Sequence, residues 1–189
     1  ADSHQCIVGN SYELNVVYKD QTYSANEQLQ NAFPIDTLMS FFLPPNDRSF
    51  PTGTYVFVQG KSDSFKTNYY LFKTYRNDTL KSSDLDDDQF GSVSLLNSLF
   101  NVNDILGEIA LGKLPRPILF DVEENDTVRV EQFALTEEYY KFLTDVNAQQ
   151  SRSGTPFDPP PANPNNNLSN GALGYFAVAH KEEVTLVIG

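Results

Sequence analysis

The side chains best suited to nucleophilic or zinc chemistry are few in this chain. Its two histidines, His4 and His180, lie at opposite ends of the sequence, and Cys6 is the only cysteine. A nucleophile needs a base within hydrogen-bond reach, so a Cys6–His180 pair would require the two chain ends to meet. Two histidines and one cysteine rarely complete a tetrahedral zinc site. We therefore expect an exposed terminal thiol and a histidine in a turn, with no catalytic residues.

The densest cluster of potential ligands is acidic. Asp84, Asp86 and Asp88 follow the 1-3-5 spacing of a calcium loop. An EF-hand would carry Gly at the sixth position and Glu at the twelfth, where this chain has Gln89 and Leu95. The sequence excludes an EF-hand and leaves two interpretations, a calcium site of oxygen ligands or a solvated acidic turn. No other cofactor is expected.

Carboxylate pairs could also act as general acid and base. Glu123-Glu124 and Glu137-Glu138 are adjacent in sequence, whereas a glycosidase places its two carboxylates on separate elements across a cleft. Exposed charge on turns and helix ends is the alternative explanation. A hydrolase would require one of three acids to converge with a second acid in a pocket: Asp121, Glu123 or Glu131.

The composition excludes several classes of function. The chain has 189 residues, with 13 Lys and Arg against 25 Asp and Glu, and a formal net charge of −12. Such a charge is repelled by nucleic acid and by anionic membrane surfaces. No apolar run approaches the ~18 residues that a membrane-spanning helix needs. We therefore expect no nucleic-acid partner and no transmembrane segment.

Apolar and polar residues alternate with period two along most of the chain, which predicts strands. A hairpin is predicted from Tyr12–Tyr18 and Thr22–Leu29. Further strands are expected at residues 35–43, 54–59, 67–75, 118–122, 127–135, 172–179 and 184–188. The strands at 54–59 and 67–75 are expected to pair with each other around a polar turn. About nine strands favour an all-β fold, an antiparallel β-sandwich of the immunoglobulin or fibronectin kind.

One short amphipathic helix is predicted from Glu137 to Gln149. Thr136 stands where an N-cap belongs, and two glutamates follow in the first turn, where the helix dipole favours negative charge. Apolar residues then recur at the spacing of one buried helix face: Tyr139, Phe142, Leu143 and Val146. The Pro- and Asn-rich stretch 151–170 is expected to pack on the sandwich, because the residues after it are too few for a second domain.

Several stretches together resemble one protein family. They are Gly9–Leu14, Gln21–Ala25, Asn68–Tyr70, Asp87–Phe90, Thr136–Leu143, Thr155–Asn163 and Leu168–Ala177. This combination resembles domain-of-unknown-function family 4249, whose members end in a strand, a Tyr-Tyr helix, a Pro-Phe-x-x-Pro-x-Asn loop and an Asn-Gly-x-Leu-Gly-Tyr-Phe strand. The resemblance covers most of residues 9 to 180.

The resemblance implies a location and a domain organisation. Members resemble secreted lipoproteins of the Bacteroidetes cell envelope, periplasmic or on the outer-membrane surface, and are often encoded near outer-membrane TonB-dependent receptors. They usually carry a signal and an N-terminal β-domain, and the resemblance implies that the sequence given is the C-terminal portion of such a protein. Residues 1–30 are therefore expected to be the last hairpin of a truncated β-domain, and residues 31–189 the sandwich domain.

The resemblance also bears on function and modification. It implies a non-catalytic envelope accessory or binding module that partners an outer-membrane protein; the alternatives are a carboxylate-based hydrolase and a calcium-dependent glycan-binding module. An Asp-Thr-aliphatic motif, similar to the O-glycosylation signal of Bacteroidetes envelope proteins, occurs three times. It makes Thr37, Thr79 and Thr127 candidate O-glycan sites, with Thr79 favoured because it lies in a predicted turn.

Overall fold

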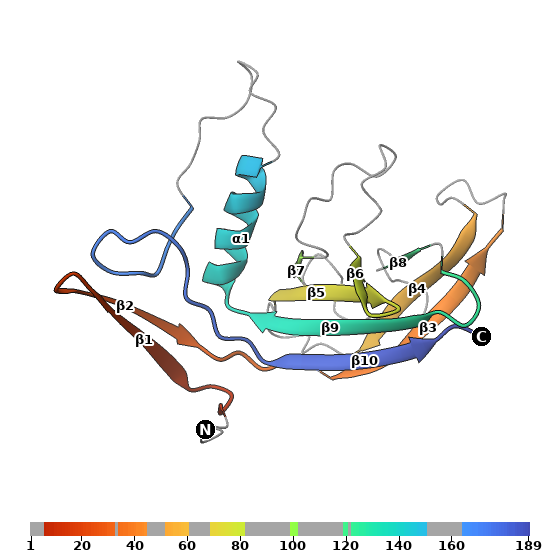
Figure 1. The fold of residues 1–189 in the computed structure, drawn as a ribbon. Helices are drawn as coiled ribbons and strands as arrows, with labels where there is room; N and C mark the ends of the chain where they lie inside the picture. Colours follow the sequence, from red (N-terminus) through yellow and green to blue (C-terminus); the bar gives the residue numbers. More distant parts are fainter. Residues whose placement is uncertain are drawn as a thin grey trace, which may run out of the picture.

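The computed structural model describes residues 6–32, 34–44, 52–60, 69–81, 99–101, 119–120, 122–150 and 164–189. Within these ranges it contains β1 (Ser11–Tyr18), β2 (Gln21–Gln28), β3 (Ile35–Leu43), β4 (Gly53–Gly60), β5 (Tyr69–Arg76), β6 (Thr79–Lys81), β7 (Leu99–Asn101), β8 (Leu119–Phe120), β9 (Thr127–Leu135), α1 (Glu137–Gln150) and β10 (Lys181–Val187) (Figure 1). No helix in this described part is long and apolar enough to span a membrane.

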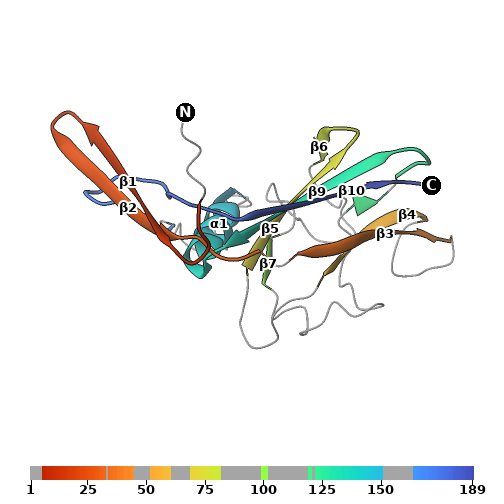
Figure 2. The ribbon, with the colours of Figure 1, turned by 90° about the horizontal axis from the view of Figure 1, so that it is seen from below.

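The strands form three antiparallel sheets. The largest has the order β10-β9-β5-β6, with β7 also paired to β5; the second has the order β3-β4-β8; the third is the β1–β2 hairpin. Seen from below, the β3–β4 pair lies beside the β9–β10 sheet, and the hairpin extends away from both (Figure 2). The expected antiparallel β-sandwich with one short helix is confirmed.

The hydrophobic core lies between the two larger sheets. Because side chains alternate along a strand, each sheet turns one apolar row inward. The core residues include Leu38 of β3, Val56 and Val58 of β4, Tyr70 and Phe72 of β5, and Val128, Val130 and Ala134 of β9. Val128 and Val130 are 0% exposed, so β9 contributes the most deeply buried side chains.

Two tight turns connect neighbouring strands. Lys19 and Asp20 have φ of 47° and 61° between β1 and β2, and Asn77 and Asp78 have φ of 49° and 60° between β5 and β6. Positive φ at both central residues is the signature of a type I′ turn, whose twist matches that of the flanking strands. Asn and Asp tolerate this conformation better than most residues, which explains the second turn.

Two expectations about strands are wrong. Strand β4 pairs with β3 and β8, while β5 pairs with β6, β7 and β9, so β4 and β5 do not form the expected hairpin. Their inner faces instead meet across the core. Residues 172–179 are not a strand, and the last strand begins at Lys181 instead of Val184, so the charged residues expected in a turn belong to β10.

One buried carboxylate secures the end of the large sheet. Asp126 accepts hydrogen bonds from the Glu123 amide (2.7 Å) and the Asn77 side chain (2.7 Å), and Arg76 Nε lies 2.6 Å from its Oδ2. The Glu123 amide is the largest cause that lowers the pKa of Asp126; Asn77 and Arg76 lower it further, against the opposing effect of burial. The carboxylate thus connects the β5–β6 turn to the start of β9.

We predict that Asp126→Asn lowers the free energy of unfolding at pH 7 by about 1.5–3 kcal/mol, the usual contribution of hydrogen bonds to a charged group. Because the folded-state pKa is depressed, this stabilisation is complete above the unfolded pKa of about 4 and disappears as the pH falls through the folded value. Denaturant unfolding of both proteins between pH 7 and pH 2 measures it, and the difference should shrink toward the acid end.

Asp78→Asn is the matched control, since Asp78 is exposed in the adjacent turn and Asn is compatible with its positive φ. It should change stability by less than about 0.5 kcal/mol. Equal losses in the two variants, or a difference independent of pH, would contradict the role assigned to Asp126.

Candidate functional site

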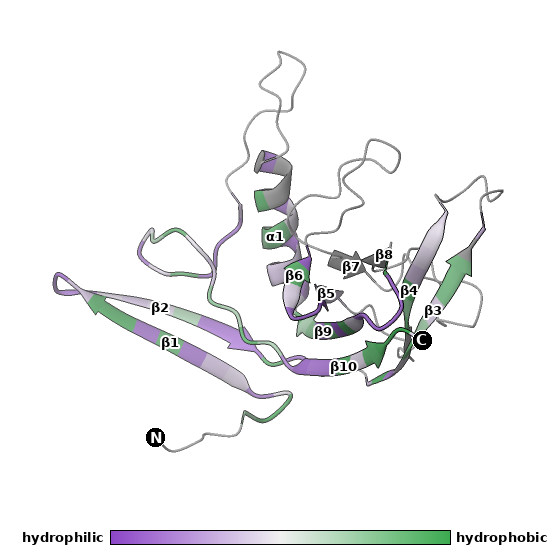
Figure 3. Cartoon of the chain, turned by 45° about the vertical axis from the view of Figure 1, so that its right-hand side comes forward, coloured by the Kyte–Doolittle hydropathy of each residue, from purple (hydrophilic) through white to green (hydrophobic). Residues whose placement is uncertain are grey.

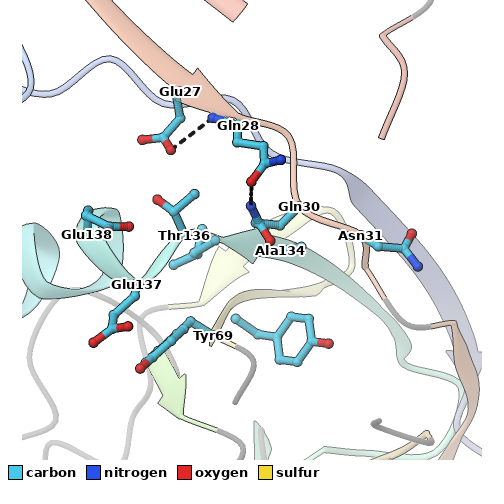
Figure 4. Close-up of a pocket in the computed structure, with 11 residues that line it drawn as sticks. Glu27, Gln28, Gln30, Asn31, Tyr69, Ala134, Thr136, Glu137 and Glu138 are labelled. Carbon is cyan, nitrogen blue, oxygen red and sulfur yellow. Dashed lines mark hydrogen bonds between the residues drawn. The ribbon is translucent and has the colours of Figure 1, made fainter. Parts of the chain in front are cut away.

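A cavity of about 590 Å³ lies where β2, the large sheet and helix α1 meet (Figure 4). Its size falls within the range of roughly 300–1,000 Å³ that is typical of ligand sites. The lining residues come from the end of β2 and the segment after it, the start of β5, the end of β9 and the first turn of α1: Glu27, Gln28, Gln30, Asn31, Tyr69, Tyr70, Ala134, Leu135, Thr136, Glu137 and Glu138. None of these residues is basic.

Helix α1 begins at the wall of this cavity for a local reason. Oγ1 of Thr136 accepts the backbone amide of Tyr139 at 3.3 Å, which satisfies one of the amides left free at a helix start. Glu137 and Glu138 occupy the first turn, and Glu137 pairs with Lys141 at 2.6 Å. The predicted cap is confirmed, and the helix extends one residue beyond the predicted end at Gln149.

Glu27 is the most unusual residue of the cavity wall. Strand β2 turns Tyr23, Ala25 and Glu27 to the same, more buried side, and Glu27 is only 7% exposed. Its Oε1 accepts the Gln28 amide at 3.2 Å. Its Oε2 is buried and has no hydrogen-bond partner among the described residues. Figure 4 shows the carboxylate directed away from the strand toward Thr136 and Glu138.

Two tyrosines, Tyr139 and Tyr175, lie near the Glu27 carboxylate. The ring of Tyr175 lies 5.0 Å from that of Tyr139 and 5.2 Å from that of Phe142. Burial raises the pKa of the Tyr175 hydroxyl, and the neighbouring Glu27 carboxylate raises it further. Burial and Glu27 also raise the pKa of Tyr139. Both hydroxyls therefore keep their protons at neutral pH.

The segment before β10 holds Tyr175 in place. Asn167 donates to the carbonyl of Phe176 (2.8 Å) and accepts its amide (2.9 Å). Ser169 exchanges hydrogen bonds with the backbone of Ser24 at 2.8 and 2.9 Å, and Asn170 donates to the carbonyl of Thr22 at 2.6 Å. Residues 167–170 thus lie along the outer edge of β2, which belongs to the hairpin and not to the two larger sheets. Residues 151–163 lie outside the described residues, so the predicted packing of the 151–170 stretch on the sandwich stays a prediction.

A family model described as Domain of unknown function (DUF4249) matches residues 2–185. The chain belongs to this family. The DUF4249 resemblance that the sequence motifs indicated is therefore confirmed. No curated protein and no solved structure matches the chain.

Of the carboxylates proposed for a hydrolase, the two that the structure describes, Glu123 and Glu131, are not among the residues that line the cavity. Glu131 is buried on the opposite face of β9 from the core, where it accepts hydrogen bonds from Tyr75 (3.0 Å), Arg129 (2.8 Å) and Lys181 (3.2 Å). Burial opposes its ionisation, but these partners outweigh burial and hold the pKa of Glu131 below its usual range. The side chain of Glu123 is 82% exposed. Asp121 lies outside the described residues.

The candidate metal ligands are not placed by the structure. Asp84, Asp86 and Asp88 lie outside the described residues, so the calcium site stays a prediction. The residues that are described contain no group of three or more side chains able to hold a metal ion. Cys6 is an exposed free thiol, as expected. His180 precedes β10, and its Nδ1 accepts the amide of Ala32 at 3.2 Å.

The three candidate O-glycan threonines differ in accessibility. Thr37 on β3 and Thr79 at the start of β6 are exposed, whereas Thr127 is partly buried at the start of β9. The aspartates before them also differ, because Asp126 is held by Arg76 and Asn77. The aspartate of the motif at residues 126–128 thus has a structural role that does not depend on glycosylation.

We predict that protein isolated from its native host carries an O-glycan at Thr79 in preference to Thr127, since an enzyme must reach an exposed hydroxyl. Peptide mass spectrometry of the native protein tests this directly. Protein from a heterologous host serves only as the unmodified reference. Unmodified peptides at all three threonines in the native material would remove the idea.

Sequence reasoning missed Glu27. A signal was available, because the predicted strand Thr22–Leu29 places Glu27 in phase with Tyr23, Ala25 and Leu29. A carboxylate on the apolar row of a strand is either paired or functional. The other walls of the cavity come from residues 42 or more positions further along the chain, and no local pattern could connect them with β2.

Proposed function

We propose that the chain is a non-catalytic binding module of the bacterial cell envelope, accessory to an outer-membrane protein. The observation that supports this most is the cavity at the start of α1, where the buried carboxylate of Glu27 on β2 shares a wall with residues of β5, β9 and α1. Side chains fixed on such elements are suited to recognition, because little order has to be created when a ligand binds.

The other chemically active side chains do not compete with this proposal. Glu131 is occupied by Arg129, Lys181 and Tyr75, and His180 by the Ala32 amide. Cys6 is exposed and has no described base beside it. Membership of DUF4249 and the motifs shared with Bacteroidetes envelope proteins support a location in the periplasm or on the outer-membrane surface, reached through an N-terminal signal.

Exposed apolar residues indicate where a protein partner could bind. Leu173 is 87% exposed in the segment that follows the 151–170 stretch. It adjoins a second cavity of about 400 Å³, which is lined by Leu14, Val16, Tyr18, Tyr23, Leu168 and Ala172 together with Asn170 and Gly171. Apolar side chains grouped at the surface in this way are typical of interaction sites, and they lie beside the cavity-forming hairpin.

We predict that full-length protein, attached to a resin, recovers an outer-membrane receptor from solubilised native envelope. Leu173→Ser should reduce the recovery several-fold, since it removes an apolar contact without touching the core. Quantitative mass spectrometry of the bound fraction measures this. Val187→Ser is the matched control, because Val187 is 61% exposed on β10, at the other end of the sheet. A recovery that neither variant changes would contradict this contact surface.

A carboxylate-based hydrolase is the second candidate, because Glu27 and Glu138 line the same cavity from separate elements. That arrangement meets one requirement of a glycosidase, two acids across a cleft. If this candidate is correct, a panel of glycoside and ester substrates should show turnover that Glu27→Gln or Glu138→Gln reduces at least about 100-fold, the scale of an acid–base residue. Turnover unaffected by either substitution would exclude these residues as the catalytic pair.

A further inference from the structure

We propose that the cavity at the start of α1 binds an organic cation, a primary ammonium or a guanidinium group, with Glu27 as its counter-ion. This inference deepens the proposed binding function by naming the ligand class of the site, and it rests on that function.

The described residues contain three buried acidic side chains, Glu27, Asp126 and Glu131. Asp126 has the Arg76 guanidinium at 2.6 Å. Glu131 has Arg129 at 2.8 Å and Lys181 at 3.2 Å. Glu27 has no described cation partner. The neutral Tyr175 hydroxyl interacts with its carboxylate, but no described donor reaches Oε2 within hydrogen-bond distance and angle. Burial of an unpaired charge is costly, so a buried acid is expected to have a cationic partner. The fold supplies one to Asp126 and Glu131 but not to Glu27.

The cavity wall is suited to a cation. It offers the carboxylates of Glu27 and Glu138, together with amide oxygens of Gln30 and Asn31, and none of its residues is basic. Glu137 is already paired with Lys141, so Glu138 at the rim is the second acid available to a ligand. The ring of Tyr69 also lines the cavity, and an aromatic face attracts ammonium and guanidinium groups.

An organic cation fits better than a metal ion. Calcium takes six to eight oxygen ligands, whereas the described residues hold no group of three or more acidic, histidine or cysteine side chains that could bind a metal ion. A guanidinium presents several donors in a plane and can serve one carboxylate with two hydrogen bonds. A cavity of about 590 Å³ also has room for the carbon chain that carries such a group.

The cation could belong to a free amine or to an arginine or lysine side chain of a partner protein. Isothermal titration calorimetry with agmatine tests the first source, and the blocked peptide acetyl-Gly-Arg-Gly-amide tests the second. The same peptide with citrulline in place of arginine has nearly the same shape but no charge. We expect binding of agmatine, of the arginine peptide or of both, and at least about tenfold weaker binding of the citrulline peptide.

Glu27→Gln keeps the shape of the side chain and removes its charge. It should weaken binding about 10- to 100-fold, the usual effect of losing a hydrogen bond between charged groups. Glu138→Gln, at the exposed rim, should weaken binding only about two- to fivefold. It also keeps the proposal testable if Glu27→Gln fails to fold. Glu124→Gln removes the same charge from an exposed turn at the other end of β9 and should leave binding unchanged.

Three results would overturn the proposal: no heat with either probe, equal binding of the arginine and citrulline peptides, or equal weakening by Glu124→Gln and Glu27→Gln. The last result would mean that only the net charge of −12 attracts the probes. None of these results bears on the recovery of an outer-membrane receptor. If the protein recovers a receptor but binds no cation, the general binding function is supported and the cation site is excluded. If it binds the cation but recovers no receptor, the cation site is supported and the receptor partner is not.

Discussion

Strand β9 is hydrogen-bonded along both edges, to β5 and to β10, and the rest of the structure depends on this double pairing. Its inward face supplies Val128 and Val130 to the core, and its outward face supplies Glu131 to the ion-pair network that joins the three strands. The strand leads into helix α1 through the single residue Thr136. The first turn of α1, and with it one wall of the cavity, is therefore fixed to the centre of the large sheet.

Features encoded by neighbouring residues could be predicted from the sequence. The helix start follows from one N-cap and two acidic residues, and the structure places Thr136 and Glu137 accordingly. The β1–β2 hairpin follows from alternation on both sides of a short polar turn. The bounds predicted for β3 and β9 agree with the structure to the residue. In each case the physical cause lies within one strand, one turn or one helix end.

Features encoded by distant residues could not be predicted. Strands β4 and β5 resemble a hairpin because they follow each other in sequence, but each pairs with other strands. The residues of β9 that pair with β5 lie more than 50 positions later in the sequence. Residues 172–179 look like a strand because they are apolar. Their backbone is instead held by the side chain of Asn167, and Leu173 faces solvent. The cavity could not be predicted for the same reason, since its walls come from β2, β5, β9 and α1, which are far apart in the sequence.

Glu27 therefore differs from the other two buried acids of the described residues, because it has no cationic partner there and its Oε2 accepts no hydrogen bond. A buried acceptor without a donor costs about 1–3 kcal/mol, against a total stability of only about 5–15 kcal/mol for a typical domain. The Tyr175 hydroxyl interacts with the Glu27 carboxylate, but it is neutral and does not balance the charge of a buried acid. Such conflicts between local chemistry and fold are expected where a side chain serves a ligand. A cation bound in the cavity would give the Glu27 carboxylate the partner that it lacks. Binding would thereby offset the free energy that burial of this carboxylate costs the folded state.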